Sequence, residues 1–193
     1  MKRIDCLELL DRTIDDNVIT VTSLSGNQLE WAHVRKRGAN FTGLNMGMCT
    51  GFAAGVALAL PRHRVVGLES DGSLLLDTSV LVTLAQAPPP NLLLIVFDNE
   101  RYGRMLPTPT ATGTDLAAIV SAAGLPPPVV TSTVEEFARA LKDALARQRL
   151  SVIIAKVEPG TGPWPEELRR EYRRDDGRPM KERFVQELRR LRQ

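Results

Sequence analysis

Cysteine, histidine and aromatic residues are scarce in this 193-residue chain, which has two cysteines, two histidines and 5% Phe, Trp and Tyr. Cys6 and Cys49 form no CxxC motif, and His33 and His63 cannot complete a Cys/His set for structural zinc. A disulfide scaffold is excluded too, because two cysteines in a chain of this length cannot staple it. The sequence therefore predicts a protein of a reducing compartment.

Long apolar runs and a strong charge of one sign are also missing. The longest apolar run, residues 52–60, is far shorter than the roughly 20 residues of a membrane-spanning helix. The N-terminus turns acidic at Asp5 without the apolar stretch of a signal peptide, so we expect a cytoplasmic protein. The net charge is only +2, and its basic surplus lies in residues 166–193. We therefore expect neither a nucleic-acid partner nor membrane association.

Strand and helix patterns alternate along the chain, whose length suits one sizeable domain. Strand-like runs cover residues 18–22, 40–44, 64–69, 91–97, 128–131 and 151–157, the last expected to close the sheet. Helix-like segments cover residues 4–14, 28–36, 47–60, 74–85 and 115–123, and a capping box at Thr133 to Glu136 opens another that runs to about 146. This alternation predicts an α/β fold: a single doubly wound, mostly parallel sheet with helices on both faces.

The composition changes towards the C-terminus. We expect an α/β domain over residues 1–163 and a charged extension over residues 164–193. Within the extension, Phe184, Val185, Leu188 and Leu191 share one stripe of a helix predicted at 178–191. That stripe predicts a helix docked on the flank of the domain, with its charges in solvent.

Polar residues follow two of the predicted strands. Asp71 comes after the strand at 64–69 and Asn99 after the strand at 91–97, which places both at the carboxyl edge of a parallel sheet. If the two strands are neighbours, they lie roughly 5 Å apart, so both side chains can reach one small cation. Carboxylate and amide oxygens suit Mg²⁺, which usually completes its shell with water and phosphate oxygens.

A phosphorylated ligand is therefore expected at this edge. Gly72 lets the backbone approach it, and the helix that opens at Ser73 offers free N–H groups and the positive end of its dipole. For each residue alone, a plain turn or loop cap is the commoner explanation. Their pairing favours the binding site.

The arrangement Asp-Gly-Ser, a helix, a strand and then Asn resembles the thiamine diphosphate signature, GDG followed roughly 25 to 30 residues later by N. Further matching stretches are Asn45 to Gly47, Thr112 to Ile119 and Val157 to Gly160. Together they resemble the thiamine diphosphate-dependent decarboxylases, and among them the sulfopyruvate decarboxylase beta subunits and the phosphonopyruvate decarboxylases.

The resemblance implies a role for each matching residue. Asp71, Asn99 and the backbone carbonyl of Arg101 would bind Mg²⁺. Met46 would wedge between the two rings of the cofactor, and the carbonyl of Leu44 would accept a hydrogen bond from its aminopyrimidine. The remaining cofactor contacts implied are Ser25, Gly26, Ser70, Gly72, Ser73 and Tyr102.

Two departures from the family pattern affect the substrate and the cofactor fit. Ser70 replaces the first glycine of the signature, and Arg104 to Pro107 replace a stretch usually rich in Gly, Ser and Thr. Arg104 is a candidate anchor for the carboxylate, sulfonate or phosphonate of a 2-oxo acid, with an ordinary solvated arginine as the alternative.

The resemblance further implies one subunit of a heteromeric enzyme. The family needs a glutamate against the pyrimidine ring, carried by a second α/β domain, and a 193-residue chain has no room for one. We therefore expect a pyrimidine-binding, alpha-type partner, with self-association of this chain as well. The alternatives are a non-catalytic, cofactor-binding relative with a regulatory or scaffold role and, last, a plain nucleotide-binding domain, which the missing GxGxxG motif disfavours.

Overall fold

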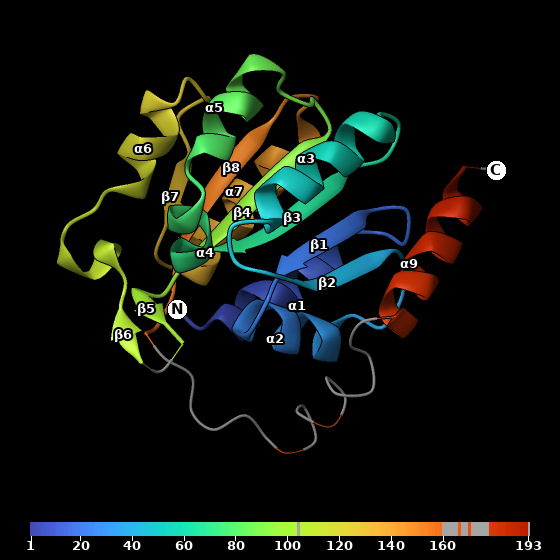
Figure 1. The fold of residues 1–193 in the computed structure, drawn as a ribbon, viewed down its shortest axis with the longest axis horizontal. Helices are drawn as coiled ribbons and strands as arrows, with labels where there is room; N and C mark the ends of the chain where they lie inside the picture. The colour runs from blue at the N-terminus through green and yellow to red at the C-terminus, as the bar shows by residue number, and fades with distance from the viewer. Residues whose placement is uncertain (104, 160–165, 167–169, 171–177, 193) are drawn as a thin grey trace.

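The computed structural model describes residues 1–103, 105–159, 166, 170 and 178–192. Six parallel strands form one sheet in the order β2-β1-β3-β4-β8-β7 (Figure 1). Their bounds are β1 (Ile19–Ser23), β2 (Asn40–Leu44), β3 (Val65–Ser70), β4 (Leu92–Asp98), β7 (Val129–Thr131) and β8 (Ser151–Lys156). The predicted α/β fold with one parallel, doubly wound sheet is confirmed.

Helices cover both faces of this sheet (Figure 1). One face carries α3 (Cys49–Ala59), α4 (Asp71–Leu76), α5 (Ser79–Gln86), α6 (Leu116–Ala122) and α9 (Arg178–Leu191). The other carries α1 (Arg3–Thr13), α2 (Gly26–Val34) and α7 (Val134–Ala146). The capping box that starts α7 is present, with Thr133 and Glu136 bonded to each other's backbone N–H groups. Among the described residues, no helix is long and apolar enough to span a membrane.

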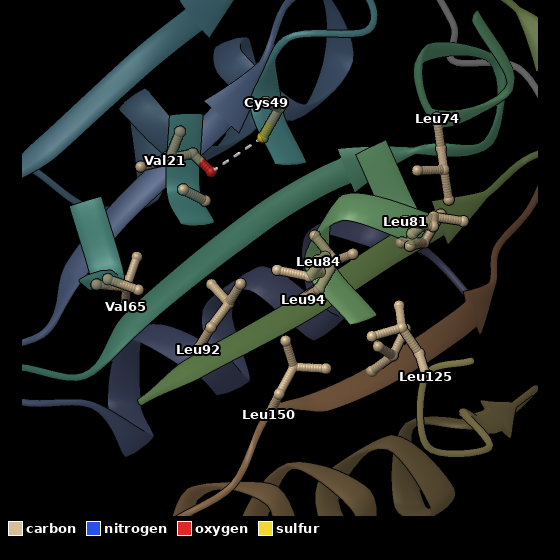
Figure 2. Close-up of a cluster of buried hydrophobic side chains, with 14 of the residues drawn as sticks. Val21, Cys49, Val65, Leu74, Leu81, Leu84, Leu92, Leu94, Leu125 and Leu150 are labelled. Carbon is tan, nitrogen blue, oxygen red and sulfur yellow. Dashed lines mark hydrogen bonds between the residues drawn. The ribbon is translucent and has the colours of Figure 1, made fainter. Parts of the chain in front are cut away.

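The central strand β4 shows why the sheet must be covered twice. Leu92 and Leu94 enter the core under α3, α5 and α6, whereas Leu93 and Ile95 enter the core under α1 and α7. Successive side chains of a strand point to opposite faces, so an unbroken apolar run needs a helix layer on each side. Figure 2 shows the first core, in which the Cys49 thiol faces the Val21 carbonyl at 3.6 Å.

Two details of the predicted element order are wrong. The helix predicted at 74–85 is split into α4 and α5, because Asp77 leaves the helical backbone conformation and accepts a hydrogen bond from the Ser79 hydroxyl. The strand at 151–156 does not close the sheet. The edge is β7, whose Val129 and Val130 are about half exposed.

The helix α9 packs by part of its predicted stripe. Phe184 is buried and meets Phe41 of β2 edge to face, with ring centroids 5.1 Å apart. Leu188 and Leu191 contact the same core, but Val185 is exposed. Val185 lies one residue beyond Phe184, about 100° further around the helix, so it turns away from the sheet. The boundary proposed at residues 163–164 lies outside the described residues.

Candidate functional site

Three neighbouring strands deliver the candidate residues to one edge of the sheet. In β3 and β4, Ser70 is in register with Phe97, so Asp71 and Asn99 follow adjacent strand ends. On the other side of β3 lies β1, which is followed by Ser25 and Gly26. The condition set for a shared cation, that the two strands be neighbours, is met.

A pocket of about 210 Å³ opens at this edge. Most of the predicted site residues lie on its wall: Ser25, Gly26, Met46, Ser70, Gly72, Ser73, Asn99, Arg101 and Tyr102. Leu44 is not part of the wall, and its carbonyl already accepts the Leu24 N–H at 2.9 Å. Arg104 lies outside the described residues.

Asp71 is the buried carboxylate next to this pocket, with 1% of its surface exposed. Its Oδ2 accepts hydrogen bonds from the hydroxyls of Thr108, at 2.6 Å, and Thr110, at 3.1 Å. Its Oδ1 is buried and has no hydrogen-bond partner within the described part of the chain. Burial raises the pKa of Asp71 above its ordinary value. A buried carboxylate oxygen without a partner is costly, so this atom suits a bound cation.

The other predicted metal ligands, Asn99 and the backbone carbonyl of Arg101, likewise offer only oxygen atoms to a cation. The Asn99 amide oxygen accepts the N–H of Arg101 at 3.1 Å and keeps a second lone pair. The described residues contain no group of three or more His, Cys, Asp or Glu side chains that could hold a metal. The donor set therefore fits a hard cation that takes part of its shell from water or a ligand's phosphate oxygens.

Gly72 and Gly26 are required by close packing around the pocket. A Cβ at Gly72 would lie 2.4 Å from a ring carbon of Tyr102, and one at Gly26 would lie 2.1 Å from the guanidinium of Arg3. Gly72 was predicted to let the backbone approach a ligand. The structure adds a second reason for the glycine, because a side chain there would collide with the Tyr102 ring. Ser25 precedes Gly26 with φ +69°, a strained backbone for a residue other than glycine.

The short helix α4 changes the expected role of Ser73. The helix begins at Asp71, not at Ser73 as predicted, and has only six residues, so Ser73 does not mark the positive end of a helix dipole. Instead, the Ser73 hydroxyl accepts the N–H of Gly47 at 3.0 Å. This bond ties the loop that carries Met46 to the turn that carries Asp71.

Glu69 holds the residues that follow the same loop, at the start of α3. It is fully buried, and its carboxylate accepts the Thr50 N–H at 3.2 Å, the Thr50 hydroxyl at 3.1 Å and the Ser70 N–H at 3.0 Å. Burial raises the pKa of Glu69, which the hydrogen bonds partly oppose. The start of α3 is thus anchored to the end of β3.

Several residues of the site were missed by the sequence reasoning. Arg3 and Asn27 line the pocket, although they belong to α1 and α2. Thr108 and Thr110 come from a Pro-rich stretch that carries no strand or helix pattern. The nearest sequence signal was their place directly after the segment that differs from the family pattern, Arg104 to Pro107.

The chain matches the family described as thiamine pyrophosphate enzyme, C-terminal TPP binding domain, over residues 25–155. It is 32% identical to "Sulfopyruvate decarboxylase subunit beta" of Methanocaldococcus jannaschii, over 82% of this chain and 85% of that one. It is 29% identical to "Phosphonopyruvate decarboxylase" of Streptomyces viridochromogenes, over 82% of this chain but 40% of that one.

Among solved structures, benzoylformate decarboxylase from Polynucleobacter necessarius superposes on 85% of this chain with a TM-score of 0.74 and 22% identity. The match covers 34% of that longer chain. At this identity the likeness concerns the fold.

Proposed function

From the premise that this chain belongs to the thiamine pyrophosphate enzyme family through a C-terminal-type TPP binding domain, we propose that it is the beta-type subunit of a thiamine diphosphate-dependent 2-oxo acid decarboxylase. It would hold the diphosphate and its Mg²⁺. The observation that carries the proposal is the Oδ1 of buried Asp71, which has no hydrogen-bond partner among the described residues and lies next to a pocket formed by three strand ends.

The chain's residues divide the binding work. Asp71, Asn99 and the Arg101 carbonyl would hold Mg²⁺, and Ser25, Gly26, Ser70, Gly72 and Ser73 would contact the diphosphate, with Tyr102 beside them. Met46 is partly exposed on the pocket wall, where it would support the bent form of the cofactor. When bound, thiamine diphosphate supplies the electron sink for the loss of CO₂.

An anionic three-carbon oxo acid, such as sulfopyruvate or phosphonopyruvate, is the proposed substrate. The names of the two relatives support this class. So does the pocket wall, whose exposed Arg101 is positively charged and whose described lining residues include no Asp or Glu; the other lining arginine, Arg3, is already paired with Glu30. A wall with this charge attracts anions.

An alpha-type, pyrimidine-binding partner would complete the site. The relative named as a beta subunit matches over most of its own length. Met48, two residues after the pocket residue Met46, and Leu76 of α4 expose 54% and 61% of their surfaces, so apolar area remains for a partner to cover. The chain would also pair with itself through such surfaces.

Thermal unfolding tests the cofactor site. Thiamine diphosphate at 100 times its dissociation constant should stabilise the chain by about 2.7 kcal/mol, but only with Mg²⁺ present. That corresponds to a rise in Tm of about 5–11 °C for a protein of this size. Asp71→Ala should abolish the rise, whereas Asp143→Ala, which removes an exposed carboxylate of α7, should keep it. Equal stabilisation in excess chelator would contradict the assignment.

Reconstitution tests the subunit role. The chain alone should release no CO₂ from sulfopyruvate, phosphonopyruvate or pyruvate, and adding the partner subunit should restore turnover. Substituting the partner's glutamate should remove it again. Robust decarboxylation by this chain alone would overturn the proposal. Tight cofactor binding with no turnover in the presence of the partner would favour the non-catalytic alternative. Ser70 is a reason to test that alternative, because it replaces the first glycine of the cofactor signature.

A further inference from the structure

The segment that begins at Arg101 leads back to the candidate site. It forms the hairpin β5 (Arg101–Tyr102) and β6 (Leu106–Pro107), followed by the 3₁₀ helix η1 (Pro109–Thr112). The hairpin places Thr108 by a hydrogen bond from its N–H to the Glu100 carbonyl at 3.0 Å. Thr108 and Thr110 are 1% and 7% exposed, so both threonines are buried at the entrance to η1.

Both threonine hydroxyls meet one oxygen of Asp71. Thr108 lies 2.6 Å and Thr110 3.1 Å from Oδ2, and the two hydroxyls are 2.8 Å apart. Thr110 also lies 2.9 Å from Oδ1 of Asp98. Since each hydroxyl has one proton, the shorter contact makes Thr108 the main donor to Asp71, while Thr110 is shared between two carboxylates.

Asp98 is itself held on its other side. Its Oδ2 is paired with the Lys156 ammonium, and its Oδ1 also accepts the Glu100 N–H at 3.3 Å. The lysine therefore partly neutralises the second carboxylate of the network, which lets two acidic side chains share one threonine.

We propose that Thr108 and Thr110 are positioning residues for the cation site. They fix Oδ2 of Asp71, so that Oδ1 would be left to bind the cation. This inference rests on the proposed function, in which Asp71 is a Mg²⁺ ligand. Without the Thr108 hydroxyl, the carboxylate can rotate and both oxygens compete for the remaining donors. Partners that orient a ligand typically change metal affinity by about 10–100-fold.

A merely structural role would look different. If the hydroxyls only satisfy a buried carboxylate, their loss lowers the stability of the metal-free protein and leaves the metal dependence of the folded protein unchanged. Metal affinity and metal-free stability must therefore be measured separately.

The test uses the full chain, with its partner subunit, and titrates Mg²⁺ at saturating thiamine diphosphate. The readout is the half-saturating Mg²⁺ concentration from ligand-induced thermal shifts, alongside the Tm without ligand. Thr108→Val keeps the shape and removes the donor, and should raise that concentration about 10–100-fold. Thr108→Ser should restore it to near the wild-type value.

Thr112→Val is the matched control. Its hydroxyl lies at the end of the 3₁₀ helix that Thr108 precedes, is exposed and, within the described residues, bonds only the Pro109 carbonyl, at 3.0 Å. This variant should behave as wild type. If Thr108→Val does not fold, Thr110→Val takes its place and should shift the concentration in the same direction by a smaller factor.

The outcomes separate the two claims. If the wild type responds to Mg²⁺ and the half-saturating Mg²⁺ concentration of Thr108→Val or Thr110→Val stays within twofold of the wild-type value, the positioning role alone is overturned. A wild-type protein with no Mg²⁺-dependent response overturns the proposed function and this inference together.

Discussion

The Arg3–Glu30 ion pair offers the sharpest test of how the pocket wall is held. The Arg3 Nε lies 2.6 Å from one carboxylate oxygen of Glu30 and its Nη2 3.1 Å from the other, with both side chains less than 10% exposed. The pair joins α1 to α2, and its guanidinium packs against Gly26 at the start of α2. A two-point contact of this kind is geometrically specific.

Replacing Arg3 alone should be strongly destabilising. Arg3→Met leaves the Glu30 carboxylate buried without its cation, which typically costs about 3–5 kcal/mol. For a chain of this size, such a loss corresponds to a fall in Tm of about 6–20 °C. Thermal unfolding followed by circular dichroism measures it.

The double variant Arg3→Met with Glu30→Met supplies the control. Replacing a whole buried ion pair by apolar residues is often neutral, so the double variant should regain most of the lost stability. A Tm for Arg3→Met within about 3 °C of wild type would refute the reasoning, since that is a change of about 1 kcal/mol. So would a double variant no more stable than the single one.

Three further predictions concern the site and the fold. Gly72→Ala should cost about 1–3 kcal/mol and weaken cofactor binding, because its Cβ displaces the Tyr102 ring; an unchanged melting curve would contradict this. Glu136 accepts the N–H groups of Ser132 and Thr133, which lowers its pKa, so its stabilising contribution is present near neutral pH and is lost as the pH falls below about 4. The Tm difference between Glu136→Gln and wild type should shrink on acidification, and a constant difference would count against it. Arg104→Ala should raise KM for anionic 2-oxo acids in the reconstituted enzyme with little effect on cofactor affinity, and unchanged kinetics would make it a solvated residue.

The local part of the fold was predictable because periodicity records which side chains are buried. The continuous apolar run of β4 identified a central strand, and the capping box at Thr133 located the start of α7. The placement of Asp71 and Asn99 at one sheet edge likewise followed from a helical segment and a strand between them, although that segment is two helices, α4 and α5. Each of these predictions needed only neighbouring residues and the geometry of a parallel sheet.

The remainder depends on contacts between distant segments. Arg3 and Glu30 are 27 residues apart, and Thr108 reaches Asp71 across 37 residues. A threonine beside prolines has the same local pattern in a solvent loop as in a buried network, so the sequence cannot separate the two. The break at Asp77 was missed because the apolar spacing on either side of it continues the helical pattern.

The shape and charge of the pocket explain why one chain should not suffice. Its volume of about 210 Å³ is below the roughly 300–1,000 Å³ of pockets that enclose a ligand, and Met105 beside it is 81% exposed. The carboxylate of Asp71 has one oxygen bound by threonines and the other suited to a cation. Glu69 is nearby but fully buried, and it already accepts three hydrogen bonds from Thr50 and Ser70. No Asp or Glu is therefore left on the described wall to act as the acid that the resembled family's chemistry requires, which agrees with the alpha-type partner proposed above as its source.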